Sequence, residues 1–385
     1  MSCPKLLWFE INRKEALPAP GRELEEIFKQ GRLVGEAAQK LFPEGIKLER
    51  EINPQKMSAK SLAAAGQRRP LFEPGFIFDH GYALADILVP VGDDAWDLIE
   101  VKASSSVKDE HYHDVAFQKY VYEGAGLKIN QCFLMHLNRD YVRHGDVEVD
   151  KLFIKEDITV EAMDLKPKIE RDIKSLLKIV AGSEPTVELG PRCRGCMLEQ
   201  VCWDFLPEDH VFLLRGNKKV AFDLMKQGIL KMADIPDYVE LNEKQGIQVE
   251  SHVSKTEHID KPAIESFIEG LKYPLYFLDF ETISPAIPVY DSSRPFEDIP
   301  FQFSLHVVEK KGEAPKHYSF LASGQTDPRP EVLERLAKLL GSSGSIVAYY
   351  AEYERRCLRQ AVKAYPKYNE WFVGIKDRFV DLLVP

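Results

Sequence analysis

The sequence lacks long apolar runs and an N-terminal targeting segment. No stretch reaches the roughly 18 consecutive apolar residues that indicate a membrane-spanning helix. Near the N-terminus, Glu10, Arg13, Lys14 and Glu15 interrupt the apolar core that a signal peptide would need. We also find no internal repeat and no low-complexity tract. These absences predict a cytoplasmic globular protein that does not engage membranes.

Cysteine is scarce, with six among 385 residues. In the reducing cytoplasm, clustered cysteines indicate metal ligands rather than disulfides. Cys132 lies in an apolar stretch and Cys357 in a helical one, so we expect both in hydrophobic cores. The other four form a pattern: Cys3 at the N-terminus, then Cys193, Cys196 and Cys202 in C-x2-C-x5-C spacing.

These four cysteines predict a metal centre. Thiolates are soft ligands that suit zinc or iron–sulfur clusters. The uneven late spacing and the remote Cys3 favour a 4Fe–4S cluster over the two symmetrical knuckles common for zinc. Zinc and buried free cysteines are the alternatives. The cluster would tie the N-terminus to the end of the first module, a structural role.

The chain has no excess of basic residues. It contains 51 Lys and Arg against 61 Asp and Glu, a formal net charge of −10. This balance argues only weakly against nucleic acid, because metal-dependent nucleases concentrate carboxylates and phosphate contacts need only a local basic stripe. Candidates for such a stripe are Arg13, Lys14, Arg68, Arg69, Lys102, Lys108 and Lys119.

The hydrophobic pattern predicts a compact α/β core in the first half of the chain. Residues 20–42 and 109–124 have helical spacing, whereas residues 71–102 and 131–137 read as strands. A charged amphipathic helix follows at 161–182, and 208–270 is helical with short breaks. Within that stretch, residues 211–236 resemble a small helix-hairpin-helix element. An apolar strand begins again at Leu275.

Two carboxylates and a lysine form the candidate catalytic group. Glu100 and Lys102 are two apart on one strand and so face the same side, and a hairpin could bring Asp86 beside them. Hard divalent cations prefer oxygen ligands, so Asp86 and Glu100, with the Val101 carbonyl assisting, predict a Mg or Mn site. Gln118 and Tyr122 are four apart on the next helix and face one side.

A plainer interpretation exists for each of these residues. A solvated strand edge also produces an Asp…Glu-x-Lys pattern, and Gln118 and Tyr122 taken alone would be surface residues. Glu100, however, is flanked by Leu98, Ile99 and Val101, which indicates a central strand. A carboxylate there costs several kcal/mol unless it is paired or metal-bound, roughly 2–7 kcal/mol for a polar group and more for a charge.

Taken together, these motifs resemble the RecB-type PD-(D/E)XK nucleases. Similarity is greatest to members with an iron–sulfur clasp, the CRISPR-associated adaptation nuclease and the AddB-type helicase-nuclease domain. Their one early and three late cysteines match Cys3, Cys193, Cys196 and Cys202, and their Asp, Glu-x-Lys and Gln-x3-Tyr motifs match Asp86, Glu100/Lys102 and Gln118/Tyr122. The resemblance implies a restriction-endonuclease-like mixed sheet flanked by helices.

One position departs from that family. The early helix usually carries a metal-binding His in a Gly-x3-His setting, but in this chain Gly31 is followed four residues later by Gly35. Glu36 comes next and is a candidate substitute ligand. This departure leaves the number of metals and the catalytic strength open.

A second acidic motif resembles DnaQ-like DEDD exonucleases, which have an RNase H-like fold and use four carboxylates. Asp279 and Glu281 share one face of an apolar strand, and residues 346–354 resemble the second motif, ending in Glu354. That family has Asn near Tyr350. Asp381 is a candidate start of the third region, and the last catalytic helix is not found, so we expect an incomplete module. A buried acidic pair without metal is the alternative.

These observations yield one functional expectation. We expect a RecB-type nuclease domain at 1–206, a helical connector at 207–270 and a partial DnaQ-like domain at 271–385, a fusion that resembles a poorly characterised bacterial family. The expected activity is that of a metal-dependent (exo)deoxyribonuclease, which hydrolyses phosphodiester bonds of single-stranded DNA or DNA ends in repair, recombination or defence; the choice between exonuclease and endonuclease stays open. The alternatives are a non-catalytic iron–sulfur nucleic-acid-binding protein and an RNA substrate.

Overall fold

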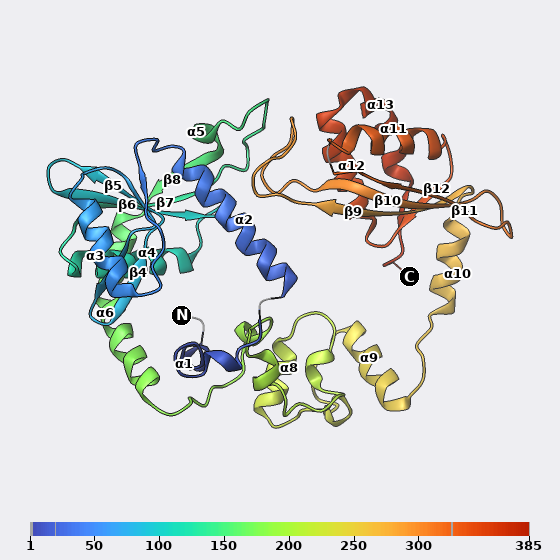
Figure 1. Cartoon of the computed structure of the whole chain (residues 1–385). Helices are drawn as coiled ribbons and strands as arrows, with labels where there is room; N and C mark the ends of the chain where they lie inside the picture. Colours follow the sequence, from blue (N-terminus) through green and yellow to red (C-terminus); the bar gives the residue numbers. More distant parts are fainter. Residues whose placement is uncertain (1–2, 20, 325, 385) are drawn as a thin grey trace. The chain divides into compact units, whose positions relative to one another are not determined.

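The protein is an α/β protein with mixed sheets flanked by helices. The computed structural model describes residues 3–19, 21–324 and 326–384. Contacts divide the chain into two compact units, one formed by residues 1–21 and 170–261 and the other by residues 22–169 and 262–385 (Figure 1). The sequence-based boundaries at 206/207 and 270/271 stay predictions.

A six-stranded sheet forms the centre of residues 22–169. Its order is β1-β2-β5-β6-β7-β8, and β6 pairs with β7 in parallel but with β5 antiparallel. The pairing confirms the expected mixed sheet. The strands are β1 (Ile46–Lys47), β2 (Leu71–Phe72), β5 (Ile87–Val91), β6 (Ala95–Lys102), β7 (Lys128–Leu137) and β8 (Phe153–Asp157).

Helices cover both faces of this sheet. Val34 and Ala37 of α2 (Arg22–Gln39) pack with Ile99 of β6 in one buried cluster. Gln118 of α4 (Asp109–Gly124) donates a hydrogen bond to Glu100, the next residue of β6. Because adjacent strand residues point to opposite sides, α2 and α4 lie on opposite faces. The helices expected at 20–42 and 109–124 are therefore confirmed.

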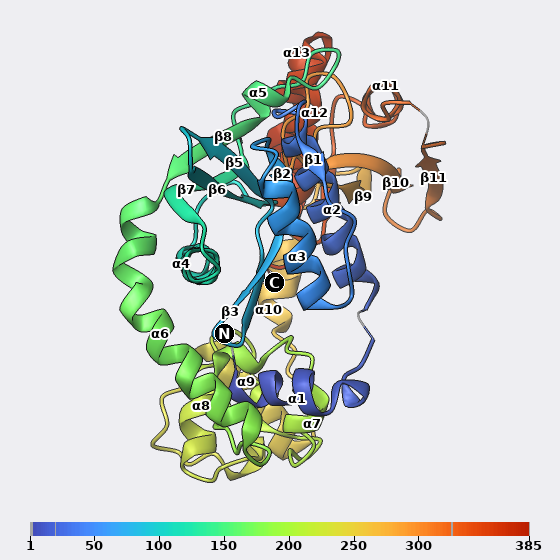
Figure 2. The same ribbon diagram turned by 60° about the vertical axis from the view of Figure 1, so that its left-hand side comes forward.

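A separate β-hairpin carries the chain toward Asp86. Strands β3 (Gly75–Phe78) and β4 (Gly81–Leu84) form a two-stranded sheet of their own, and this hairpin contacts both α3 (Pro54–Ala65) and α4 (Figure 2). Reading residues 71–102 as strands placed Asp86 inside a strand, and that placement was wrong. The chain leaves β4 at Leu84 and enters β5 at Ile87, because it changes from the hairpin to the main sheet, and Asp86 lies in the bend between them.

The C-terminal residues form a second sheet with the order β11-β10-β9-β12-β13. β9, β10 and β11 are antiparallel neighbours, whereas β12 is parallel to both β9 and β13. Buried residues Leu278, Phe303 and Leu336 belong to its core, and so does Cys357, which confirms that prediction. The elements are β9 (Leu275–Ile283), β10 (Ile299–Val308), β11 (Lys316–Leu321), α11 (Arg329–Leu339), β12 (Ser345–Ala348), α12 (Ala351–Ala364), α13 (Asn369–Ile375) and β13 (Phe379–Asp381).

The loop between β9 and β10 joins this sheet to the first one. Ala286 is buried in the cluster that also contains Val34 of α2. Arg143, in the loop after β7, donates hydrogen bonds to the carbonyl oxygens of Pro288 and Val289 at 2.9 and 2.8 Å. These contacts explain why residues 22–169 and 262–385 form one unit.

The unit formed by residues 1–21 and 170–261, called the first unit below, is mainly helical. The N-terminal helix α1 is fastened to the end of α6, because the indole of Trp8 donates a hydrogen bond to the Gly182 carbonyl at 2.9 Å. The aromatic rings of Trp203, Phe212 and Phe222 pack together in its core. Its helical segments are α1 (Pro4–Asn12), α7 (Glu199–Cys202), η3 (Val211–Leu213), α8 (Lys219–Lys226), η4 (Met232–Asp234) and α9 (Glu243–Ser254), and the flanking helices are α6 (Thr159–Ala181) and α10 (Lys261–Gly270).

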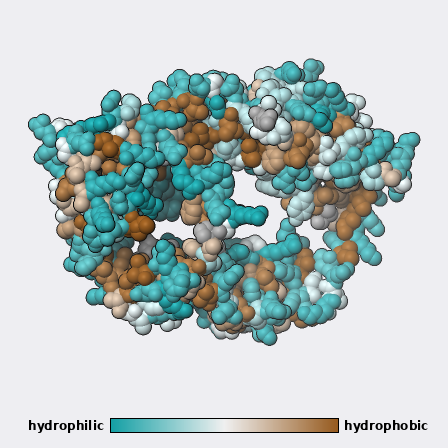
Figure 3. Space-filling model, viewed as in Figure 1, coloured by the Kyte–Doolittle hydropathy of each residue, from teal (hydrophilic) through white to brown (hydrophobic). Residues whose placement is uncertain are grey.

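Hydrophilic residues dominate the molecular face shown in Figure 3, with apolar patches between them. Among the described residues, no helix combines the length and the apolar composition needed to span a membrane.

Candidate active site and cysteine cavity

Asp86, Glu100, Lys102 and Gln118 meet at one end of the six-stranded sheet. An Asp86 carboxylate oxygen (Oδ2) accepts a hydrogen bond from the Val101 amide at 2.6 Å, which holds the bend against β6. The Lys102 ammonium lies 2.8 Å from Glu100 Oε1. The Gln118 amide donates to Glu100 Oε2 at 2.8 Å. The four side chains therefore form one connected group although they span 33 positions of sequence.

The two carboxylates of this group repel each other. Burial, followed by the charge of Glu100, raises the pKa of Asp86 well above its usual value of 3.8, and the Val101 amide and Lys102 oppose that rise only in part. Glu100 itself is 8% exposed. A bound cation would reverse this balance, because it favours both ionised carboxylates. Two buried carboxylates in contact fit the donor set of a hard divalent ion.

Lys102 remains charged despite its partial burial. Burial alone would lower its pKa, but Glu100 and Asp114 outweigh that effect and raise the pKa above the ordinary lysine value. Its nitrogen lies 2.9 Å from Asp114 Oδ2. An ammonium held in this way is suited to stabilise developing negative charge and unsuited to act as a base.

Tyr122 lies behind the carboxylates and contacts the backbone beside them. Its hydroxyl accepts a hydrogen bond from the Ala85 amide at 2.8 Å and donates one to the Pro74 carbonyl. Burial, with smaller contributions from Glu100 and Asp86, raises its pKa. Tyr122 is fully buried, so it is a positioning residue that fixes the bend at Asp86. This geometry fits a role in orienting the metal site rather than in binding the substrate backbone.

Of the remaining sequence candidates, Val101 lies within the group and Glu36 lies outside it. Val101 lies in β6 between the two key residues, and its amide is the Asp86 partner. Glu36 is exposed on α2 and its nearest described cation is Lys47, 3.9 Å away. The interactions described for Asp86 and Glu100 do not include Glu36, so the structure does not bring this candidate ligand into the group.

Asp114 is a site residue that sequence reasoning missed. It is exposed on α4 and forms the second ion pair of Lys102. Asp114, Gln118 and Tyr122 stand at four-residue intervals, so they line one face of the helix. That spacing was the available signal, but the Gln-x3-Tyr motif drew attention only to its last two members.

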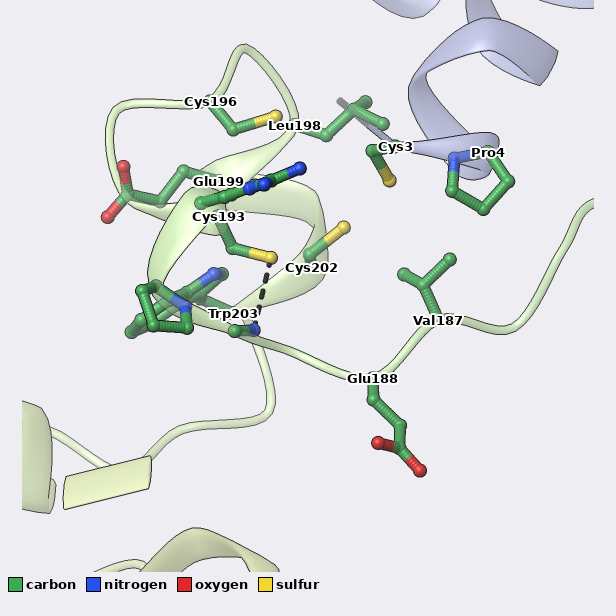
Figure 4. Close-up of a pocket in the computed structure, with 13 residues that line it drawn as sticks. Cys3, Pro4, Val187, Glu188, Cys193, Cys196, Leu198, Glu199, Cys202 and Trp203 are labelled. Carbon is green, nitrogen blue, oxygen red and sulfur yellow. Dashed lines mark hydrogen bonds between the residues drawn. The ribbon is translucent and has the colours of Figure 1, made fainter. Parts of the chain in front are cut away.

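The four patterned cysteines line one cavity of about 300 Å³ in the first unit. Figure 4 shows the sulfur atoms of Cys3, Cys193, Cys196 and Cys202 turned toward a shared space beside Pro4 and Leu198. All four are free thiols. The structure thus brings Cys3 to the three late cysteines across about 190 positions of sequence, as the pattern 3, 193, 196, 202 shows.

Local structure explains how each thiol is placed. Cys3 directly precedes α1, which starts at Pro4 and therefore needs no amide at that position. Gly195 adopts φ of 70° and turns the chain between Cys193 and Cys196. The Gly190 amide donates a hydrogen bond to the Cys193 sulfur at 3.3 Å. Burial raises the pKa of Cys202, while the nearby Lys5 opposes the rise.

The cavity holds a soft donor set that suits zinc or an iron–sulfur cluster. Within the described ranges, no three His, Cys, Asp or Glu side chains meet closely enough to hold one metal ion. Zinc binds thiolates at about 2.3 Å, so four zinc ligands would converge tightly. A 4Fe–4S cluster also takes four cysteine ligands, so the thiols that line this cavity are donors for either centre.

A second acidic group lies in the C-terminal sheet. Asp279 and Glu281 are both exposed on the face of β9 opposite its buried residues, as the alternation predicted. Glu354 of α12 is 3% exposed and its Oε2 has no hydrogen-bond partner in the described structure. Burial, then Asp279 and Asp381, raise the pKa of Glu354 to about 7. The group therefore contains Asp279, Glu354 and Asp381, whereas Glu281 does not contribute to this shift.

Asp381 has a structural task in this group. Its Oδ1 accepts hydrogen bonds from the amides of Tyr350 and Leu383, both at 2.9 Å. Tyr350 has φ of 62°, a left-handed conformation that favours Gly or Asn. Asp381 thus holds the turn between β12 and α12 that places Glu354.

The comparisons with known proteins concern only this C-terminal part. Residues 276–385 match the model of a family described as a domain of unknown function, DUF2779. No curated protein matches the chain. The matched segment contains the whole acidic group of Asp279, Glu354 and Asp381, whereas Asp86, Glu100, Lys102 and the four cysteines lie outside it.

Proposed function

We propose that the protein is a metal-dependent nuclease that hydrolyses phosphodiester bonds at the Asp86–Glu100–Lys102 group. One observation carries the proposal: two carboxylates in contact, with a charged lysine 2.8 Å from one of them, lie at a partly exposed strand end. Such an arrangement is costly for a purely structural site, because it places like charges together. It is the arrangement that a divalent-cation site and a phosphate require.

The residues would divide the work as follows. Asp86 and Glu100, with the Val101 carbonyl, would hold Mg or Mn, which lowers the pKa of bound water and neutralises phosphate charge. Lys102 would stabilise the negative charge that develops on the scissile phosphate. Gln118 would keep Glu100 oriented through its 2.8 Å hydrogen bond, and Tyr122 would keep the Asp86 bend in place.

We further propose that the cysteine cavity holds a 4Fe–4S cluster with a structural role. Cys3 directly precedes α1 and the other three thiols lie in the segment after α6, so a cluster in the cavity they line would join these two parts of the chain. In this proposal the protein resembles RecB-type nucleases with an iron–sulfur clasp and acts in the cytoplasm on single-stranded DNA or DNA ends. The alternative substrate is RNA.

For the C-terminal module we propose an RNase H-like fold related to DnaQ-type exonucleases. The strand order β11-β10-β9-β12-β13, with three antiparallel strands followed by parallel ones, supports this relation. The buried, unpaired Glu354 oxygen beside Asp279 is compatible with a second Mg or Mn site. We leave Glu281 in this proposed site because it shares the β9 face with Asp279.

Cleavage of end-labelled oligonucleotides tests the main proposal. Single-stranded DNA, duplex DNA and RNA of one sequence are incubated with Mn and the wild-type protein, Lys102→Ala, Asp279→Asn or Lys128→Gln. Lys128 is a matched control, because it is exposed and its carboxylate partner among the described residues is Asp94. We expect Lys102→Ala to lose at least about 100-fold in rate, the scale of a removed charge-stabilising donor, and Lys128→Gln to keep full activity.

Three outcomes would contradict the proposal. Equal cleavage by wild type and Lys102→Ala would show that the Lys102 group does not catalyse the reaction. No cleavage by either protein, when both bind the oligonucleotide, would favour a non-catalytic iron–sulfur nucleic-acid-binding protein. If Asp279→Asn alone abolished cleavage, the C-terminal group would be the active one.

A further inference from the structure

A group of cations without acidic partners lies beside the cysteine cavity. Four of its five members are exposed and Lys218 is partly buried. Within the described residues none of the five forms an ion pair with a carboxylate, although the chain carries a net charge of −10. The group, termed here the basic patch, consists of Arg192, Arg194, Arg215, Lys218 and Lys219.

Two segments of the first unit bring the basic patch together. Arg192 and Arg194 flank Cys193, and the other three cations belong to the loop before α8 and its first residue. The chain next to each segment is packed together, because the rings of Trp203 and Phe212 lie 4.6 Å apart. Burial and the proximity of Arg194 lower the pKa of Lys218, which places these two cations near each other.

Hydrogen bonds from side chains of α9 hold the loop that carries Arg215 in a fixed shape. Gln245 of α9 is 2% exposed and donates a hydrogen bond to the Arg215 carbonyl at 2.9 Å. Gln248 accepts from the Arg215 amide and donates to the Leu213 carbonyl, both at 2.9 Å. Gly216 adopts φ of 74°, which turns the loop. The backbone is therefore fastened to α9, while the Arg215 side chain stays exposed.

The carboxylates near the basic patch form no ion pair with its members within the described residues, although Glu188 and Glu199 line the same cavity as Arg192. Glu199 accepts a hydrogen bond from the Gly195 amide at 2.6 Å. Asp209 pairs with His252 at 3.4 Å. Like charges gathered on a rigid surface raise the local potential and attract a polyanion, even on a protein with negative net charge.

We propose that the basic patch binds the phosphate backbone of a nucleic acid without regard to its sequence. This inference rests on the proposed nuclease function for the choice of nucleic acid as the polyanion. It assigns the first unit a substrate-holding role in addition to carrying the cysteines. Anionic lipid, the other common polyanion, is an outcome of the test.

The test measures binding without turnover. Fluorescence anisotropy of a labelled single-stranded oligonucleotide is recorded in EDTA over a range of NaCl concentrations, with full-length protein purified without oxygen. The double variant Arg215→Gln/Lys219→Gln leaves the cysteine segment untouched. We expect it to bind about tenfold more weakly and to lower the slope of log K against log salt by roughly 1.4, since each phosphate contact on a single strand contributes about 0.7.

The matched control is Lys316→Gln/Lys338→Gln, which removes two exposed cations that each have a carboxylate partner. Equal losses in both double variants, or no loss in either, would overturn the inference. Tighter binding to vesicles containing phosphatidylserine than to DNA, lost in the Arg215→Gln/Lys219→Gln variant, would assign the patch to lipid and also overturn it. Binding is measured in EDTA, which removes the metal that cleavage needs. The binding result therefore does not depend on the outcome of the cleavage comparison with Lys102→Ala.

Discussion

Replacing Asp86 by Asn should stabilise the protein in the absence of metal. In the folded protein Asp86 is in contact with Glu100, and burial together with that charge raises its pKa. An Asn at this position keeps an oxygen that accepts from the Val101 amide, which the wild type places at 2.6 Å. Its amide group can donate to Glu100, so a repulsive contact becomes an attractive one.

The direction in which stability changes with pH follows from the difference between the pKa values of Asp86 in the folded and unfolded states. The folded pKa of Asp86 lies above the usual value of 3.8, so the folded state binds the proton more tightly than the unfolded state. The corresponding stability is present below about pH 3.8 and is lost as the pH rises through the folded pKa. The Asn variant does not suffer that loss, and its advantage is therefore greatest at neutral and higher pH.

The expected magnitude is a few kcal/mol. One unit of pKa shift corresponds to about 1.4 kcal/mol, and a hydrogen bond to a charged group contributes about 1.5–3 kcal/mol. We expect a gain of about 1–3 kcal/mol, equivalent to about 2–8 °C in Tm for a unit of this size. Addition of Mn should reverse the order, because metal at 1,000 times its Kd stabilises the wild type by about 4.1 kcal/mol, more than the expected gain.

Thermal unfolding at pH 7.5, followed by tryptophan fluorescence in EDTA and in Mn, measures both effects. Asp94→Asn is the matched control, since Asp94 is exposed and paired with Lys128, and its Tm should change little. An Asp86→Asn protein less stable than wild type in EDTA would refute the electrostatic reasoning. An undiminished Mn response in that variant would remove Asp86 from the metal site.

Four further predictions follow from the same structure. Tyr122→Phe removes both hydroxyl hydrogen bonds and leaves the Ala85 amide unpaired, so the free energy of unfolding should fall by about 1–3 kcal/mol in denaturant titration. Tyr350→Asn relieves a left-handed tyrosine and should raise the free energy of unfolding by about 1 kcal/mol; a lower value would contradict the assigned φ. The pKa of the Glu354 carboxyl is raised to about 7, so the wild type should lose stability as the pH rises from about 4.5 to 7, and Glu354→Gln should remove that loss. An unchanged pH profile of Tm in the variant would contradict this prediction. Protein purified without oxygen should be brown, with absorbance near roughly 400 nm that Cys202→Ser loses; a colourless protein with one zinc would replace the cluster by zinc.

The helices and strands with regular spacing could be read from the sequence. The helix predicted at 109–124 is α4, and the apolar strand predicted from Leu275 is β9. The shared face of Glu100 and Lys102 also follows from the two-residue period of a strand. These features depend on neighbouring residues only, which explains why one sequence was enough to predict them.

Features that depend on bends in the chain and on the orientation of helices were harder to predict. Asp86 was expected inside a strand, but the chain changes sheets there and forms a bend. Asp114 was missed because its role depends on the direction in which Lys102 points across to α4. Glu36 was a candidate because of its place after Gly35, yet the orientation of α2 leaves it exposed near Lys47.

The sequence by itself determined which chemical groups are available: four cysteines in a 3, 193, 196, 202 pattern, the Glu-x-Lys strand and the paired acids of β9. Only the tertiary structure decided which of them meet. It brings Cys3 to the late cysteines by fastening α1 to the end of α6, and Asp86 to Glu100 by pairing β5 with β6. The physical reason is that residue spacing fixes local geometry, whereas strand pairing and helix packing act between residues far apart in the chain.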